Sequence, residues 1–478
     1  MVMGELSQET EVLVIGGGPG GYAAAFRAAD LGLEVTLVDT APRPGGVCLY
    51  RGCIPSKTFL HLAELVLDAA AAAGRGVTFG APKIDLEGLR RWKSRVIEKM
   101  AGGLAALAQR RNVQLIQGRA EFESSESVIL HEAEIRRIRF RHAVIAVGSR
   151  PIALPGAEFR PGGRIMSSTG ALALADIPES LLVIGGGYVG LELGMVYAAF
   201  GSRVTLVEQH ERILPGIDRD LVEPLLERLQ KLFAALHFRT RVLELGEDDH
   251  GVRARLAGEA GEFAERFSRA LVAVGRRPAT DGLGLERTRV ERDARGFIVV
   301  DARMATADPR ISAVGDAVGG QMLAHKASAE GKVAAEAIAG KPARFDARAV
   351  PAVVYTDPQV AWCGLTEEEA RRLGIEVRVT RFPWRFSGRA VTLGAPEGVT
   401  KLIAEPGSGR ILGMGVCGRQ AEGLIAEGVL AVEMGALAED LAAILHPHPT
   451  LSETEGEAAE LFFGNAIHLL AKTPSPPP

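Results

Sequence analysis

The chain has 478 residues, 47% hydrophobic and 24% charged, a composition typical of a globular protein with about three domains at ~150 residues each. The 55 Lys and Arg residues are balanced by 59 Asp and Glu residues, which argues against a nucleic-acid-binding protein. Residues 1–11 contain three Glu and no Lys or Arg, so they resemble no targeting peptide. Four cysteines do not form a disulfide scaffold in so long a chain, so we expect a cytoplasmic α/β protein that binds neither nucleic acid nor membrane.

The first predicted unit is a buried strand at residues 11–15, a glycine-rich turn, an alanine-rich helix and a second strand that ends in Asp39. Gly16 allows the tight turn, Gly18 lets the backbone approach a pyrophosphate, and Gly21 lets the helix pack closely on the strand. The N-terminus of the helix offers free N–H groups to phosphates, and Asp39 can accept hydrogen bonds from a ribose. This pattern predicts a dinucleotide-binding βαβ unit.

Two cysteines, Cys48 and Cys53, lie in a glycine-containing loop after this unit. Pro55 suits the first turn of a following helix, so Cys53 would lie near a helix N-terminus, where partial positive charge favours a thiolate. A close thiol pair in a reducing cytosol is more often redox-active or metal-binding than structural. Zinc would need further ligands, and Cys363 and Cys417 lie in other predicted elements. We predict a redox-active pair, with a metal site and buried spectator thiols as alternatives.

Residues 181–208 repeat the pattern of the first unit, with a glycine-rich turn at Gly185, Gly187 and Gly190 and a second strand that ends in Glu208. The duplication disfavours the alternative that these turns merely link packed elements. Glu208 would repel a 2′-phosphate, although an arginine follows shortly after it, so we expect NAD(H) rather than NADP(H). Two nucleotide sites suggest a flavin and a nicotinamide, but the pattern alone does not say which unit holds which.

From about residue 350, strands alternate with amphipathic helices and no further dinucleotide turn appears, which predicts a separate α+β domain. Within it, residues 421–441 predict one helix that is apolar on more than one face. The predicted fold class is α/β, with two Rossmann-like dinucleotide-binding domains and a C-terminal α+β domain. The predicted segments are a first nucleotide-binding domain at 1–150, a second at 151–278, a return to the first at 279–349, the C-terminal domain at 350–470, and a disordered tail at 471–478.

His448 and Glu453 lie five residues apart near the end of the C-terminal domain. Histidine can accept a proton near neutral pH when a carboxylate fixes its tautomer. In isolation, a surface histidine in a proline-containing loop is the plainer interpretation. We interpret His446 as non-catalytic, because an HxH metal site would need a third ligand, and we predict no metal site.

Taken together, these motifs resemble those of the flavin-dependent disulfide reductases, the class I pyridine nucleotide-disulfide oxidoreductases, over nearly the whole chain. The matching motifs are residues 48–57, the two glycine-rich turns, and residues 313–316, 322–326, 355–362 and 446–453. The match is best with members that oxidise dihydrolipoamide with NAD⁺. It implies FAD in the first unit, NAD in the second, and a lipoyl-domain carrier protein as partner, from a 2-oxo-acid dehydrogenase complex, glycine cleavage or sulfur oxidation.

The resemblance also implies roles for individual residues. Cys48 would exchange with substrate, Cys53 would face the flavin, and Lys57 and Glu192 would form a pair beside its ring. The remaining matched positions are predicted cofactor contacts, namely Asp316 at the ribityl chain of FAD, Ala324 and Ala120 through their backbone, and Val242 and Gly275 for NAD.

By the same resemblance, His448 is the base and Glu453 its orienting carboxylate, and both enter the active site of the other subunit of a homodimer. The C-terminal domain would then be the dimerisation domain. Tyr188 either covers the nicotinamide pocket or packs as a core residue. Tyr50 departs from the motif, where a smaller polar residue is usual, which leaves the surroundings of the thiols open.

Two other functions compete with this interpretation. One is a different disulfide or metal-ion reductase of the mercuric or glutathione type, and the other is a non-catalytic flavoprotein scaffold. Mercuric reductases usually end in a cysteine pair, which residues 473–478 lack, and NADP-dependent relatives carry arginines where Glu208 stands. The complete set of thiols, base and carboxylate argues against a scaffold.

Overall fold

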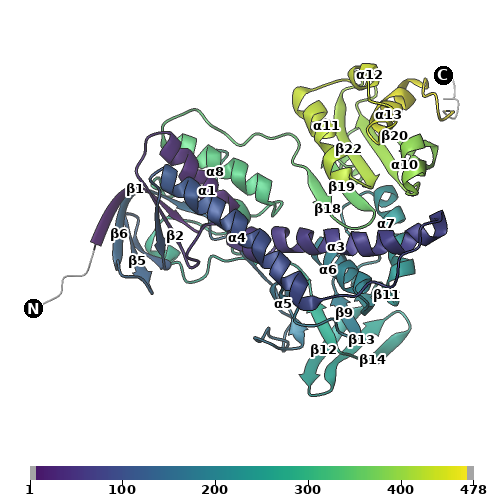
Figure 1. The fold of residues 1–478 in the computed structure, drawn as a ribbon. Helices are drawn as coiled ribbons and strands as arrows, with labels where there is room; N and C mark the ends of the chain where they lie inside the picture. Colours follow the sequence, from purple (N-terminus) through teal and green to yellow (C-terminus); the bar gives the residue numbers. More distant parts are fainter. Residues whose placement is uncertain (1–6, 471–478) are drawn as a thin grey trace, which may run out of the picture.

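The computed structural model describes residues 7–470 (Figure 1). Residues 1–6 lie outside this range, and so does the predicted tail at 471–478. Two bodies are built on largely parallel sheets, and a C-terminal body is built on an antiparallel sheet. The predicted α/β fold class is therefore confirmed.

The first glycine-rich unit lies in a seven-stranded sheet with the order β3-β2-β1-β6-β5-β4, in which β17 also pairs with β6. Strand β1 pairs in parallel with β2 and β6, as the βαβ prediction requires. Both faces of β1 are buried from Val12 to Ile15, which is usual for a central strand of a parallel sheet. The strands are β1 (Ser7–Ile15), β2 (Val35–Asp39), β3 (Gln114–Gln117), β4 (Arg119–Ser124), β5 (Ser127–His131), β6 (Arg137–Ile145) and β17 (Ile311–Ala313).

Helices α1 (Pro19–Asp30) and α8 (Ala324–Ile338) pack against each other beside this sheet (Figure 1). They approach closely because Gly331 faces the backbone of Gly20, where a Cβ atom would clash. Helix α8 thus returns the chain to the first body after the second is complete. The exact domain boundaries stay a prediction.

The segment that carries the cysteines is helical, and the predicted loop is wrong. A short helix, α2 (Gly46–Arg51), is followed by Gly52 and then by α3 (Cys53–Ala72). Gly45 and Gly46 have φ values of 149° and 60°, so the turn into α2 is made by residues without a Cβ. Helix α3 packs against α4 (Leu86–Arg110) and runs from the first body toward the C-terminal body (Figure 1).

The second glycine-rich unit lies in a parallel sheet with the order β11-β10-β9-β15-β8. Its central helix α6 is buried along most of its length, and the antiparallel sheet β12-β13-β14 and the pair β16-β7 complete this body. The strands are β7 (Ser149–Pro151), β8 (Ile165–Met166), β9 (Ser180–Ile184), β10 (Arg203–Val207), β11 (Ala235–His237), β12 (Arg241–Asp248), β13 (Gly251–Gly258), β14 (Gly261–Phe267), β15 (Arg269–Val272) and β16 (Arg276–Pro278). The helices are α5 (Ser168–Ala173), α6 (Tyr188–Ala199) and α7 (Arg219–Leu232).

The C-terminal body has the antiparallel strand order β18-β19-β22-β21-β20, with helices around the sheet (Figure 1). The strands are β18 (Ala352–Val354), β19 (Gln359–Gly364), β20 (Arg378–Pro383), β21 (Val399–Ala404) and β22 (Ile411–Gly418). The helices are α9 (Glu367–Leu373), α10 (Gly388–Leu393), α11 (Ala421–Met434), α12 (Ala438–Ala443) and α13 (Glu453–Phe463).

The predicted single helix at residues 421–441 is wrong, because the structure divides it into α11 and α12. Gly435 follows α11 with a φ of 68°, the left-handed conformation that ends many helices. The apolar periodicity continues past this residue, so the pattern did not reveal the break.

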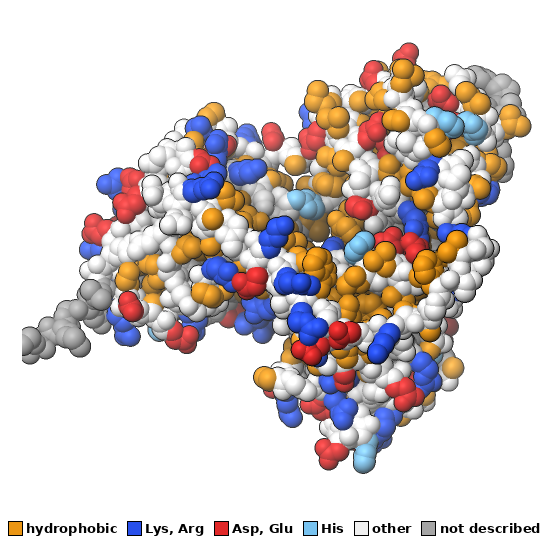
Figure 2. All heavy atoms as spheres, in the orientation of Figure 1, with side chains coloured by type: hydrophobic (Ala, Val, Ile, Leu, Met, Phe, Trp, Pro, Cys, Tyr) orange, Lys and Arg blue, Asp and Glu red, His pale blue; other side chains and the backbone are white. Residues whose placement is uncertain are grey.

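Over residues 7–470, no helix is both long and apolar enough to span a bilayer. On the face drawn in Figure 2, basic and acidic side chains are interspersed. A uniformly basic area, which a nucleic acid would need, is not seen on this face.

Candidate active site

A cavity of about 270 Å³ opens beside the first glycine-rich turn and the start of α3. Nine residues predicted from the sequence line it, namely Gly16, Gly18, Asp39, Cys48, Cys53, Lys57, Glu192, Asp316 and Ala324. Gly21 does not line it, because it packs against the carbonyl of Gly16, where a Cβ would clash. Ala120 does not line it either, since its side chain is buried in the core of the sheet. The predicted contact of FAD with the backbone of Ala120 stays a prediction.

The glycine-rich turn is shaped to accept a pyrophosphate. Gly16 has a φ of 105°, and a Cβ on Gly46 would collide with the Cα of Gly18. Gly18 caps α1 without a side-chain hydrogen bond, so the first N–H groups of the helix remain available for an anion. Asp39 accepts the N–H groups of Gly17 and Ala41 and still has lone pairs to offer a ribose. The residues of this site fit a dinucleotide such as FAD.

The two predicted thiols lie together on the wall of this cavity. Cys48 and Cys53 hydrogen bond to each other, as predicted for a pair that can form a disulfide. The pKa of Cys53 is lowered to about 7, mainly by the hydrogen bond from Cys48. Burial raises this pKa, while the positive charge of Lys57 lowers it further. The pKa of Cys48 is raised by its hydrogen bond to Cys53 and by burial. Cys53 is therefore the thiolate of the pair and Cys48 carries the proton.

Lys57, which is half-buried, forms an ion pair with the buried Glu192 next to the thiols. The Lys57 Nζ lies 2.7 Å from the Glu192 carboxylate, and Glu192 is 3% exposed. The backbone N–H of Tyr355 donates to the same carboxylate at 3.0 Å, and the Lys57 Nζ lies 4.3 Å from the centre of the Tyr355 ring. Tyr355 was not predicted as a site residue, although it begins one of the motifs that carry the family resemblance.

Asp316 and its neighbour Gly315 form hydrogen bonds with residues that were not predicted as site residues. Asp316 accepts a hydrogen bond from the Ser149 hydroxyl, which in turn accepts one from Arg276 at 2.7 Å. The neighbouring Gly315 N–H donates to the buried Glu330 at 2.8 Å. No local pattern could have indicated this network, because its members come from distant parts of the chain.

A second cavity of about 430 Å³ lies against the second glycine-rich turn. Five predicted residues line it, namely Gly185, Gly187, Glu208, Val242 and Gly275. Gly190 instead packs against the Gly185 carbonyl, in the role predicted for the third glycine of the turn. Glu208 is buried and accepts N–H groups from Gly186 at 2.6 Å and from His210 at 2.8 Å.

Tyr188 lines both cavities and is 41% exposed. A packed core tyrosine, the alternative considered from the sequence, would be buried. The other questioned tyrosine, Tyr50, donates its hydroxyl to the carbonyls of Arg43 or Pro44 and so anchors the chain before α2.

His448 and Glu453 form the predicted pair, but away from the thiols. The His448 Nδ1 lies 2.8 Å from the Glu453 carboxylate, which also accepts the Thr450 N–H at 2.7 Å. Burial by itself would raise the pKa of Glu453, but its contacts with Thr450 and His448 outweigh this effect and lower the pKa. Glu453 therefore stays charged beside the imidazole ring. His448 is largely exposed and lines neither cavity of its own chain. Within one chain, the predicted base therefore lies outside the cavity that holds the thiols.

Comparison with known protein families separates the chain into two matched parts. Residues 10–331 match the model of the pyridine nucleotide-disulphide oxidoreductases, and residues 350–459 match the dimerisation domain of the same family. The chain belongs to this family. The resemblance inferred from the sequence is confirmed, and the C-terminal body carries the dimerisation domain.

Relatives and solved structures match over nearly the full length. A dihydrolipoyl dehydrogenase of Vibrio parahaemolyticus is 44% identical and covers 96% of this chain and 97% of its own. The crystal structure of LpdA from Mycobacterium tuberculosis has a TM-score of 0.87 at 27% identity, covering 94% of this chain and 99% of its own. The HOCl-induced flavoprotein disulfide reductase RclA from Escherichia coli has a TM-score of 0.83 at 26% identity, with the same coverage.

Proposed function

We propose that this protein is a dihydrolipoamide dehydrogenase, which oxidises protein-bound dihydrolipoamide to lipoamide and reduces NAD⁺ to NADH. The observation that carries the proposal is the pair of Cys48 and Cys53, hydrogen bonded to each other on the wall of the cavity beside the first glycine-rich turn. The 44% identity to a dihydrolipoyl dehydrogenase over 96% of the chain favours lipoamide over other disulfide substrates.

FAD occupies the first cavity in this proposal, with its pyrophosphate at the N-terminus of α1 and a ribose beside Asp39. When bound, FAD supplies a two-electron relay between the thiols and the nicotinamide. NAD⁺ occupies the second cavity, where the buried Glu208 disfavours a 2′-phosphate. Tyr188 lies between the two sites in this proposal, because it lines both cavities.

The thiols carry out disulfide exchange. One substrate thiolate attacks the sulfur of Cys48, so a mixed disulfide forms and Cys53 leaves as a thiolate. The second substrate thiol loses its proton to His448 and attacks the substrate sulfur in the mixed disulfide. This releases lipoamide and leaves Cys48 and Cys53 reduced by two electrons, which pass on to NAD⁺. The low pKa of Cys53 suits it as the leaving thiolate.

A homodimer completes the site. His448 and Glu453 lie on the dimerisation domain and away from the thiols of their own chain, which supports a base supplied by the second subunit. The substrate is carried on a lipoyl domain of a partner protein, and we place the reaction in the cytoplasm, where a dithiol can be maintained. The predicted domain boundaries and site residues form part of this proposal.

The test measures NADH formation from dihydrolipoamide and NAD⁺ by the purified flavoprotein. The wild type should turn over, and Cys53→Ser should lose turnover while retaining FAD. Cys363→Ala is the matched control, because this thiol is buried in the core of the C-terminal body and should not be needed for activity. A Cys53→Ser variant as active as the wild type would overturn the proposal. A wild type that instead reduces glutathione disulfide, Cu(II) or Hg(II) would identify one of the competing reductases.

A further inference from the structure

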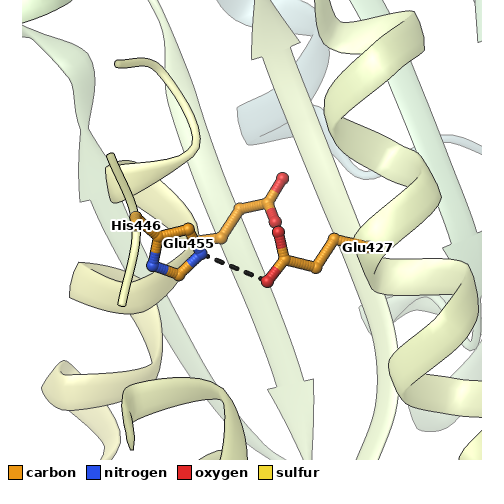
Figure 3. Close-up of side chains that lie close together, drawn as sticks. All are labelled: Glu427, His446 and Glu455. Atoms are coloured by element: carbon orange, nitrogen blue, oxygen red, sulfur yellow. Dashed lines mark hydrogen bonds and ion pairs between the residues drawn. The ribbon is translucent and has the colours of Figure 1, made fainter. Parts of the chain in front are cut away.

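Three side chains that serve no part of the proposed reaction converge in the C-terminal body (Figure 3). Glu427 comes from α11, Glu455 from α13, and His446 from the loop that leads to His448. One nitrogen or oxygen atom of each lies within 4.8 Å of the corresponding atoms of the other two. The His446 Nε2 lies 3.1 Å from the Glu427 Oε1.

Glu455 is the unusual member of this cluster. Glu455 is 0% exposed, and among the described residues no donor group reaches its carboxylate oxygens, which can bond to the Glu427 carboxylate only through a shared proton. Among the described residues, no lysine or arginine forms an ion pair with Glu455 or Glu427. Figure 3 shows the Glu455 carboxyl group pointing toward that of Glu427. Burial of a carboxylate without a partner is costly, so a positive charge or a proton must accompany it.

The backbone around the cluster is adapted to bring the ligands together. A Cβ on Gly456 would lie 3.1 Å from the His446 Nδ1, so the absence of a side chain there lets the imidazole lie against α13. On α11, a Cβ on Gly428 would lie 2.8 Å from Met414, so this glycine lets the helix that carries Glu427 pack closely on the sheet. Both glycines directly follow a member of the cluster, and both bring its helix closer to its neighbours.

We propose that Glu427, His446 and Glu455 bind a divalent metal ion, and that Zn²⁺ is the ion this ligand set favours. One imidazole nitrogen and two carboxylates are common Zn²⁺ ligands, with bonds of about 2.0–2.2 Å, and a fourth position remains for water. In this proposal the ion lies between the carboxylate oxygens of Glu427 and Glu455 and the ring nitrogen of His446.

The ion would act on the proposed acid–base pair through the backbone. His446 lies two residues before His448, and Glu455 lies two residues after Glu453. A metal that joins His446 to α13 and α11 therefore holds both ends of the segment that carries His448 and Glu453. These ligands are positioning residues, because they touch neither the thiols nor the cofactor cavities.

Metal binding is measured on the intact FAD-containing protein in its oxidised form, so that Cys48 and Cys53 are tied up as a disulfide. After chelator treatment and Zn²⁺ titration, we expect one Zn²⁺ per chain. Glu455→Gln should weaken binding at least ~10-fold, because Gln keeps the size of the side chain but not its charge. X-ray absorption of the bound ion should show nitrogen and oxygen ligands and no sulfur.

Glu457→Gln is the matched control. Glu457 also lies on α13 and also pairs with a histidine, His468 at 2.5 Å, but it is not part of the cluster. This variant should bind Zn²⁺ like the wild type. Hydrogen exchange of residues 446–453 should slow on addition of Zn²⁺ in the wild type and the control, but not in Glu455→Gln.

Each measurement can refute the metal site without touching the proposed dehydrogenase activity. A wild type that binds no Zn²⁺, or binds it no more tightly than Glu455→Gln, would overturn the proposal and leave Glu455 as a protonated carboxyl. Sulfur ligands in the absorption spectrum would overturn it as well, since they would place the ion at the cysteines.

Discussion

The reactivity of Cys53 depends on its immediate neighbours. The hydrogen bond from Cys48 is the largest influence on its pKa, and the positive charge of Lys57 adds to it, while burial opposes both. Cys53 is also the first residue of α3, where the unpaired N–H groups of the helix favour negative charge. Lys57 is itself held by the ion pair with Glu192. The protonation of Cys53 thus depends on residues of two helices, Lys57 on α3 and Glu192 on α6.

Because the pKa of Cys53 is lowered to about 7, the thiolate should be present above that pH and disappear below it. In the two-electron-reduced protein, the ultraviolet absorbance of thiolate, measured against Cys53→Ser, should rise with an apparent pKa near 7. Turnover should fall as the pH drops through the same range. Cys48→Ala should move the thiolate titration to higher pH, since it removes the main stabilising hydrogen bond. A titration near the ordinary value of 9.0 in the reduced wild type would contradict this assignment.

Each glycine-rich turn must let its helix pack closely on the preceding strand and must also leave open space for a ligand. The third glycine of each turn packs against the carbonyl of the first, because helix and strand approach too closely for a Cβ. The middle glycine has a different task. Gly187 has an ordinary φ of −80°, and a Cβ there would meet nothing within 4 Å. One glycine therefore serves packing, and the other leaves space for a ligand.

Replacing these two glycines should separate stability from binding. Gly190→Ala should lower the free energy of unfolding by about 1–3 kcal/mol, because its Cβ collides with the Gly185 carbonyl. Gly187→Ala should leave urea unfolding nearly unchanged but weaken NADH binding, since the methyl group projects into the second cavity. Urea unfolding and NADH fluorescence titration measure the two effects. Similar stability losses in both variants would contradict the distinction.

For the whole molecule, the decisive feature is that the thiols and the predicted base lie on different bodies of the fold. The cavity that holds Cys48 is lined only by residues between 16 and 327, whereas His448 lies on the exposed surface of the C-terminal body. Exposed apolar side chains on the same body, such as Leu430 at 62% and Met434 at 76%, are consistent with a covered interface. We therefore expect a complete site to require two chains.

Mixing inactive subunits tests this arrangement. Cys48→Ser and His448→Gln homodimers should each be nearly inactive. A heterodimer of the two has one site with both defects and one site with an intact thiol pair and an intact base. After unfolding and refolding of an equal mixture, about half the dimers are heterodimers with one working site, so about a quarter of wild-type turnover should return. No recovery, despite heterodimers detected by mass spectrometry, would show that thiols and base act within one chain.

Much of the site could be predicted from local patterns. The turn glycines, the acids at the ends of the following strands and the cysteine pair are each set by a few consecutive residues. Other features escaped prediction because they depend on packing. The break at Gly435 lies within an unbroken apolar pattern, and the chain around Cys48 forms a helix although its glycines suggest a loop. Tyr355 meets Lys57 only because the C-terminal body packs beside α3.

The sequence by itself determined the α/β class, the two dinucleotide turns and the identity of the thiols, since these follow from backbone geometry and chemistry over short stretches. Only the tertiary structure decided that Ala120 lies in the core, that Tyr188 borders both cavities, and that His448 lies apart from Cys48. It also brought Glu427 and Glu455 to His446. These contacts join residues far apart in the chain, and their energies depend on burial and on the packing of whole elements, which no short pattern records.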